Sequence, residues 1–334
     1  MRFITEIQAW LTETYGFPVP RLFAEVTRIV LTFMEEGYHD PFDYLGWELT
    51  PALHLFSNGQ AGHDLFARHP WTPIEMFSFG WSGTDGEHYG YLIHAPELKQ
   101  SDYPIVEFEP MNDFGLNLVG PDTRSGLEGL LSLIVGAEYA TALHKHHELA
   151  FMLDLHPTAQ KADWYQNRRA VIPAIPDGWR YEPTSDGVGV LAPAHTFSPN
   201  HEADSACDYE IQAVESDLQT ILRKAEIALE QGYPATALAI IRESYWQQYD
   251  VDNFNQYAPL WSQAYADLGR PLLADTVDRI LKNPWAMQQG EDSSASAAES
   301  SDESSVVEFD ETSGSEFQDE TIVPMIAASW LEDI

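Results

Sequence analysis

Residues 77–113 read FSFGWSGTDGEHYGYLIHAPELKQSDYPIVEFEPMND and alternate short aromatic or β-branched runs with glycine-rich turns. Such alternation is typical of antiparallel strands joined by tight turns. We therefore predict strands at 74–79, 88–93 and 105–108, with a hairpin turn at 81–86 between the first two. This pattern predicts an antiparallel sheet at the centre of the N-terminal part of the chain.

Glycine and asparagine mark the turns of this region. Asp85-Gly86, in the turn that contains Gly83, supplies the positive φ that such hairpins need, and Asn58-Gly59 indicates an earlier turn. Gly90 lies between two tyrosines whose rings fall on one face of the strand. Because glycine has no side chain, Gly90 allows another part of the protein to pack closely on the opposite face.

These turns also carry a resemblance. The Asn-Gly turn at 56–59, the Gly-x-Asp-Gly turn at 83–86, the Tyr-Gly-Tyr-Leu run at 89–92 and the Pro-Ile-Val run at 104–106 together resemble the SUKH superfamily. The resemblance covers roughly residues 20–135. It implies a domain that binds other proteins without catalysis, as in Smi/Knr-type cell-wall regulators and bacterial toxin-immunity proteins. Two helices before the first turn, a later β meander and a helical extension depart from the minimal pattern.

Hydrophobic periodicity predicts further elements on either side of these strands. The predicted helices are 3–14, 20–36, 51–56, 125–135 and 138–154, and a short strand is predicted at 116–119. The β pattern returns between 164 and 199, with strands expected at 171–172, 179–181 and 188–191. This meander belongs either to the first domain or to a separate small subdomain.

An internal repeat lies in the C-terminal part of the chain. Gly232-Tyr-Pro-Ala-Thr-Ala matches Gly269-Arg-Pro-Leu-Leu-Ala, with Gly, Pro and the final Ala recurring after 37 residues. A helix, a glycine turn and a second helix starting near proline resemble the unit of tetratricopeptide-like repeats. Two such units are too few to bury a continuous core alone, so we expect this block to dock on the first domain or on a partner.

The predicted fold class is therefore α+β, with a mainly antiparallel SUKH-like sheet packed with helices over 1–200. An all-α domain of helical hairpins follows at 205–285. Residues 286–334 are rich in Ser, Glu and Asp, with too little apolar surface to offset the entropy of ordering. We predict a disordered acidic tail there, interrupted by short apolar segments that either punctuate a linker or bind a partner.

Charge and composition exclude several classes of function. The 334 residues carry a formal net charge of -36, which disfavours nucleic-acid binding and favours a basic protein partner. The single Cys207 cannot form an internal disulfide, which indicates a reducing compartment. The sequence contains no apolar run long enough to span a membrane and no pattern typical of a signal peptide. We expect a cytoplasmic protein with no cofactor.

Two groups of histidines are candidates for a catalytic or metal site. His144–Glu148 lacks the second histidine of a zincin helix, and adjacent helical residues diverge by about 100°. His88 and His94 near Asp85 could form an acid–base site, but Asp85 is better explained as a turn residue. No phosphate loop or serine-hydrolase motif is present. We therefore expect no catalytic residues and no metal site.

The binding hypothesis depends on aromatic and acidic residues around the predicted sheet. Aromatic anchors inside an acidic rim suit a basic protein partner. The residues expected to contact the partner are Glu87, Glu97, Asp102, Trp81 and Trp71. The principal hypothesis is an immunity-type inhibitor that masks a basic toxin. The alternatives are a regulatory scaffold that recruits proteins through both domains, and an unrecognised metal-dependent hydrolase that uses His88 or the 144–148 cluster.

Overall fold

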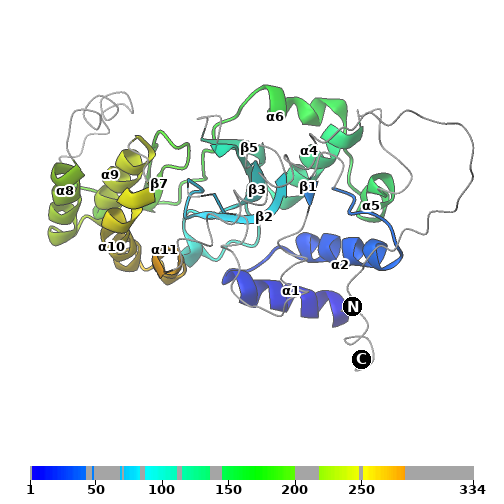
Figure 1. Ribbon diagram of the computed structural model, residues 1–334, viewed down its shortest axis with the longest axis horizontal. Coiled ribbons are helices and arrows are strands. Elements are labelled where there is room, and N and C mark those ends of the chain that lie inside the picture. The colour runs from blue at the N-terminus through cyan, green and yellow to red at the C-terminus, as the bar shows by residue number, and fades with distance from the viewer. Residues whose placement is uncertain are drawn as a thin grey trace, which may run out of the picture.

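The structure of the chain is a computed structural model in which the sheet lies between two groups of helices (Figure 1). It describes residues 2–42, 47–48, 68–69, 71–82, 87–110, 115–135, 145–199, 218–247 and 251–282. The predicted helix at 51–56, the turns at Asn58-Gly59 and Gly83–Gly86, and the predicted acidic tail at 286–334 lie outside the described residues.

An antiparallel meander forms the central sheet. Its strands are β1 (Trp47–Glu48), β2 (Met76–Ser82), β3 (His88–Leu92), β4 (Ile105–Phe108) and β5 (Leu116–Gly120), and each pairs with the next along the chain. The predicted strands therefore exist and pair antiparallel. The first of them begins and ends later than 74–79, because the pairing with β3 continues as far as Trp81.

Gly90 permits the close approach of β2 and β3 that the sequence predicted. Ser78 pairs with Gly90 but Gly80 pairs with Tyr89, so the register shifts and Phe79 is the extra residue of a β-bulge. A Cβ atom on Gly90 would lie 2.5 Å from the carbonyl oxygen of Phe77. Only glycine fits at this position without displacing the neighbouring strand.

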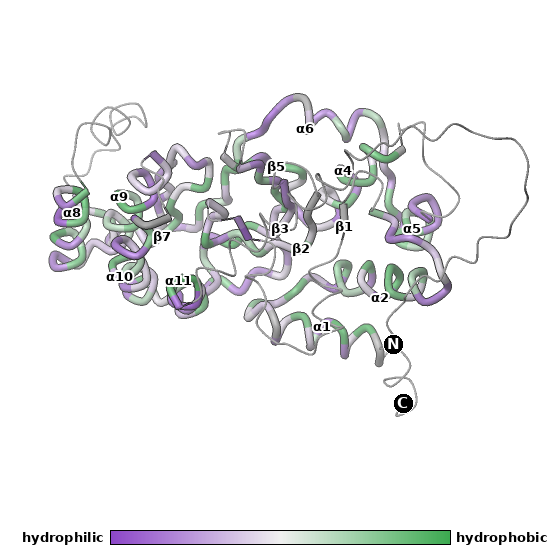
Figure 2. Tube along the Cα trace, viewed as in Figure 1, coloured by the Kyte–Doolittle hydropathy of each residue, from purple (hydrophilic) through white to green (hydrophobic). Residues whose placement is uncertain are grey.

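Helices α1 (Arg2–Tyr15) and α2 (Arg21–Glu35) pack on the sheet through aromatic rings. The ring of Phe17 lies 4.9 Å from that of Phe77, and the ring of Phe23 lies 4.8 Å from that of Phe79. Figure 2 shows hydrophobic residues alternating with hydrophilic ones along both helices. The amphipathic pattern at 3–14 and 20–36 thus predicted two real helices, and Phe79 is buried beneath them.

Helix α4 (Thr123–Val135) follows β5 directly and packs on β4 and β5 through glycines. A Cβ atom on Gly126 would lie 2.5 Å from the Cβ atom of Ile105, so the helix approaches the strand more closely than an alanine would allow. The predicted helix at 125–135 is therefore present and begins two residues earlier, at Thr123.

The predicted helix at 138–154 is wrong in its extent. The structure has α5 at His146–Met152, and residues 136–144 lie outside the described residues. Lys145 has a φ of 52° and Asp154 also has a φ of 52°, which places both in the left-handed region. Because non-glycine residues with this backbone interrupt a right-handed helix, α5 is confined to the turns between them.

After α5, the chain forms a 3-10 turn (Ala159–Ala162) and α6 (Asp163–Gln166). It then forms a two-stranded sheet of β6 (Trp179–Glu182) and β7 (Val190–Pro193). The strand predicted at 171–172 is wrong. Pro173 and Pro176 remove backbone donors from this segment, so Val171 is buried and Ile172 is exposed without a strand partner.

The C-terminal block consists of α8 (Leu218–Glu230), α9 (Pro234–Gln247), α10 (Val251–Asp267) and α11 (Pro271–Lys282). Gly232 and Gly269 end the first helix of each pair with φ values of 81° and 74°. After each glycine, the next backbone N–H returns to a carbonyl five residues earlier at 2.8 Å, a Schellman-type cap. The repeated sequence motif therefore forms the same helix-turn-helix unit twice.

The C-terminal block docks on the sheet domain, which is one of the two arrangements expected from the sequence. One cluster of buried side chains runs from Ile7 in α1 to Ile280 in α11. A Cβ atom on Gly16 would lie 2.6 Å from the Cδ1 atom of Leu272, which shows how closely α11 approaches the end of α1. Within the described part of the chain, every helix is too short or too polar to cross a bilayer.

Candidate functional site

Glu87 does not form an exposed contact, contrary to the sequence prediction. Only 8% of the residue is exposed, and its carboxylate accepts a hydrogen bond from the hydroxyl of Tyr89. Residues two apart along a strand share a face, so Glu87 points to the same side as the buried tyrosine. The sequence interpretation failed because it treated the start of β3 as part of an exposed loop.

Glu97 and Asp102 are exposed residues, but internal partners engage their carboxylates. Glu97, in the 3-10 turn Pro96–Leu98, accepts from Nε of Arg270 at 3.0 Å. Asp102 accepts from the backbone N–H of Thr123 at 3.0 Å and also from its hydroxyl, which caps the first turn of α4. Both carboxylates therefore have a structural role.

The structure describes the side chain of Trp71 and the backbone pairing of Trp81, the two tryptophans of the predicted surface. Trp71 is half-buried, and its ring lies 6.2 Å from that of Trp246 in α9. It therefore helps to join the sheet to the helical block. Trp81 pairs through its backbone with His88 and Glu48. The residues predicted for the turns, Asn58, Gly59, Gly83, Asp85 and Gly86, lie outside the described residues, as does His144.

His88 and His94, the candidates for an acid–base site, have separate structural partners. His88 is buried, and its Nε2 atom lies 2.9 Å from the hydroxyl of Thr72. Nε2 of His94 lies 2.8 Å from the carbonyl oxygen of Val188. Each histidine is therefore part of a different packing contact.

Three glutamates form the densest group of carboxylates in the described residues. Glu87, Glu107 and Glu109 each offer an oxygen within 4.8 Å of the others. They converge because Tyr89 in β3 pairs with Glu107 in β4, so that side chains from both strands meet on one face. The sequence signal for this group is the alternation of Glu87 with Tyr89 and of Glu107 with Glu109, but alternation alone does not reveal the register.

Internal partners bind this carboxylate group and offset most of its charge. Arg168 donates to Glu109 at 2.6 Å, and the side-chain amide of Asn117 donates to Glu107 at 2.8 Å. Burial, followed by the hydrogen bond with Glu87, raises the pKa of Glu107 to about 8, although the hydrogen bond from Asn117 acts in the opposite direction. At neutral pH, Glu107 is therefore protonated and donates to the Glu87 carboxylate.

Carboxylate oxygens are the ligands that Mg²⁺ and Ca²⁺ prefer in proteins. Glu87, Glu107 and Glu109 are the residues of the described chain whose spacing suits such an ion. Here, however, an arginine, an amide and a proton already satisfy the three carboxylates. The geometry is that of a buried carboxylate group held by its own neighbours.

Replacing Glu107 by Gln should stabilise the protein at alkaline pH. The folded state keeps the Glu107 proton up to about pH 8, whereas the unfolded chain releases it near its ordinary pKa of 4.5. Wild-type stability therefore falls as pH rises between these values, and E107Q removes that loss while keeping a donor to Glu87 and an acceptor for Asn117. We expect E107Q to gain about 4 kcal/mol at pH 8 and only about 1 kcal/mol at pH 5.

Urea unfolding at the two pH values measures this difference. The control is E148Q, the same substitution at an exposed glutamate that pairs with Lys145. E148Q should show no such pH-dependent gain in stability. A destabilised E107Q protein at pH 8 would show that Glu107 is ionised in the folded state.

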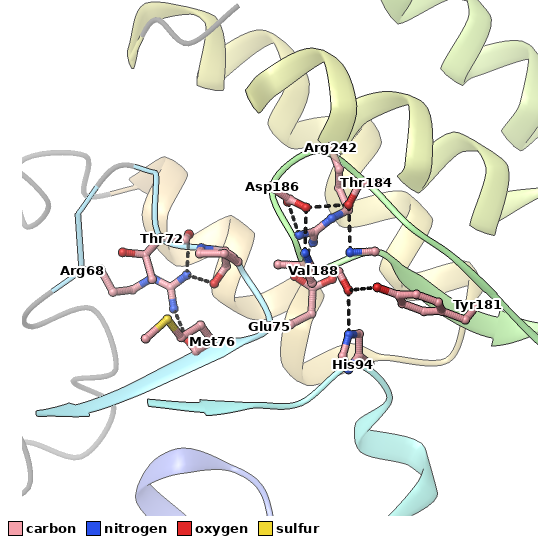
Figure 3. Close-up of polar contacts among 12 residues, drawn as sticks. Arg68, Thr72, Glu75, Met76, His94, Tyr181, Thr184, Asp186, Val188 and Arg242 are labelled. Atoms are coloured by element: carbon pink, nitrogen blue, oxygen red, sulfur yellow. Dashed lines mark hydrogen bonds and ion pairs between the residues drawn. The ribbon is translucent and has the colours of Figure 1, made fainter. Parts of the chain in front are cut away.

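A second cluster of buried charges joins the helical block to the sheet (Figure 3). Arg242 in α9 is 1% exposed and binds the carboxylates of Glu75, which precedes β2, and Asp186, in the turn between β6 and β7. The next residue of α9, Glu243, accepts from the backbone N–H of Ser185 at 2.8 Å. Two adjacent residues of one helix therefore hold the hairpin turn.

The hairpin turn is organised from within as well. Asp186 accepts from the hydroxyl of Thr184 at 2.5 Å and from the backbone N–H of Val188 at 3.0 Å. Burial alone would lower the pKa of Arg242, but the charges of Asp186 and then Glu75 raise it above its ordinary value. Arg242 is therefore a fixed cation between two carboxylates from different parts of the chain.

Searches against known proteins do not assign the chain to a family: no family model matches it, and no curated protein matches it.

Proposed function

We propose that the chain is a non-catalytic protein-binding protein, most closely an immunity-type inhibitor that masks a basic toxin. The observation that carries this proposal is its charge. The chain has 53 acidic and 17 basic residues, and at least ten of the basic residues form ion pairs with its own carboxylates. Few cations are left to offset the acidic surface, which favours attraction of a basic partner.

The burial of Glu87 and the internal pairing of Glu97 and Asp102 move the proposed contact surface elsewhere. Helix α1 exposes Glu6 and Glu13 to solvent, and Glu35 at the end of α2 and Glu36 just after it are exposed as well. Arg21 in α2 is already paired with Glu25 at 3.0 Å. An anionic helical surface of this kind suits a cationic protein, because electrostatic complementarity speeds encounter and fixes orientation. The resemblance to SUKH domains supports the same class of function.

Binding kinetics with a basic toxin encoded by a neighbouring gene test this proposal. We expect a one-to-one complex whose association rate falls about tenfold between 50 and 500 mM salt, because salt screens surface charges. Changing Glu6, Glu13, Glu35 and Glu36 together to Gln should also slow association about tenfold. The matched control changes Glu226 and Glu230, which face Arg223 on α8, to Gln.

No complex with such a toxin, or a complex that is indifferent both to salt and to the substitutions at Glu6, Glu13, Glu35 and Glu36, would contradict the proposal. A regulatory scaffold is the second candidate, and the two helix-turn-helix units of 218–282 favour it. A scaffold would bind two different proteins at once, whereas an inhibitor binds one. Pull-down experiments with and without residues 289–334 separate a contribution of the acidic C-terminal segment from that of residues 1–288.

A further inference from the structure

His94 occupies the junction between the sheet and the helical block. It follows β3 and is 7% exposed, and its Nε2 donates to the carbonyl oxygen of Val188 in the β6–β7 hairpin at 2.8 Å (Figure 3). The ring of Tyr181, from the same hairpin, packs edge-on at a centroid distance of 6.1 Å. The hydroxyl of Tyr181 donates to the same Val188 carbonyl at 3.1 Å. One backbone oxygen thus joins His94 to the hairpin.

Charged groups from the sheet and from the helical block act on this imidazole. Two buried arginines of the helical block, Arg242 and Arg270, act on it electrostatically, together with the Glu75 carboxylate from the sheet. Both arginines also hold the junction: Arg242 binds Glu75 and Asp186, and Arg270 donates to Glu97 and to the carbonyl oxygen of Leu191. The two arginines already bind the three carboxylates of the junction. A positive charge on His94 would therefore add a third cation without adding a carboxylate to bind it.

We propose that His94 is an acid-sensitive latch, whose protonation releases the β6–β7 hairpin and the helical block from the sheet. The proton has no carboxylate partner of its own in the closed junction, because Glu75, Asp186 and Glu97 are bound by arginines. In an opened junction the imidazole meets water and accepts the proton readily. Acid therefore favours the open arrangement, and the neutral imidazole favours the closed one. This device is independent of the proposed toxin binding.

The size of the effect follows from proton linkage. Burial lowers the pKa of His94 to about 4, with the two arginines adding to the shift and the Val188 hydrogen bond and Glu75 opposing it. The ordinary value of 6.5 applies when the junction opens. The open junction therefore binds the proton more tightly than the closed junction does. Lowering the pH from 8 to 5 raises the equilibrium constant for opening by about 30-fold.

Hydrogen exchange of the full chain, corrected for the intrinsic rate at each pH, tests the latch. In the wild type we expect peptides from 186–192 and 234–247 to lose about 30-fold of their protection at pH 5 relative to pH 8, while α2 loses none. H94Q retains a donor near the position of Nε2 and cannot titrate, so it should keep protection at both pH values. H195Q removes an exposed histidine after β7 and should behave as the wild type does.

His69 is the competing explanation. Burial also lowers its pKa to about 4, and its Nδ1 accepts from the backbone N–H of Trp71 at 3.2 Å near the same junction. The proposal is overturned if H69Q, and not H94Q, abolishes the acid response, or if protection falls equally throughout the protein. If H94Q does not fold, imidazole NMR of the wild type decides: titration of His94 near 6.5 without loss of protection would also overturn it.

Discussion

Replacing Arg242 by Met is expected to lower the free energy of unfolding by about 3–5 kcal/mol, because it leaves two buried carboxylates without their cation. Arg242 and Glu75 are each almost fully buried, so water cannot compensate either charge in the folded state. The loss should appear in urea unfolding as a lower midpoint. It should also loosen the helical block, since Arg242 joins α9 to both the sheet and the hairpin turn.

The matched control is Arg223→Met on α8. Arg223 is exposed and pairs with Glu226 and Glu230 on the surface, where an ion pair contributes less than about 1 kcal/mol. A third variant, R242M with E75Q and D186N, removes all three charges and should recover part of the lost stability. Equal losses for R242M and R223M would show that the buried cluster is unimportant for stability.

Replacing Gly90 by Ala is expected to destabilise the sheet domain by about 3 kcal/mol, at the upper end of the usual cost of overpacking. The new Cβ atom would lie 2.5 Å from the carbonyl oxygen and 2.8 Å from the carbonyl carbon of Phe77. These are backbone atoms of the adjacent strand, which cannot rotate away as a flexible side chain can. Strands β2 and β3 would have to separate where the bulge already disturbs their pairing.

Thermal or urea unfolding measures this loss, with Tyr91→Phe as the control on the same strand. The Tyr91 hydroxyl lies 3.0 Å from the hydroxyl of Thr123, and its removal should cost only about 1 kcal/mol, the typical net value of one hydrogen bond. A G90A protein that is as stable as Y91F would mean that the two strands adjust to the methyl group.

Local sequence pattern predicted most of the strands and helices correctly. The pleat of a strand and the turn of a helix impose periods on the hydrophobic residues, so the elements at 88–93, 105–108, 20–36 and 125–135 could be found without tertiary information. The repeat of Gly232 and Gly269 predicted two helical hairpins for the same reason, since each glycine adopts the left-handed conformation that ends a helix.

The candidate site was harder to predict because it depends on contacts between distant residues. Exposure of Glu87 was inferred from its place beside a turn, whereas its burial depends on the register that brings Tyr89 opposite Glu107. Glu97 was expected to meet a partner protein, but Arg270, 173 residues further along the chain, binds it. Nothing in the sequence around Glu97 indicates this arginine.

By itself, the sequence determined the acidic charge, the antiparallel strands, the need for glycine at position 90 and the paired helical hairpins, because each follows from composition or from neighbours along the chain. Only the tertiary structure decided which carboxylates are buried and which cations hold them. Arg242 and Glu75 are 167 residues apart and meet only because the helical block docks on the sheet. Tertiary packing determines which charged residues meet at such sequence separations, and a local sequence pattern does not contain this information.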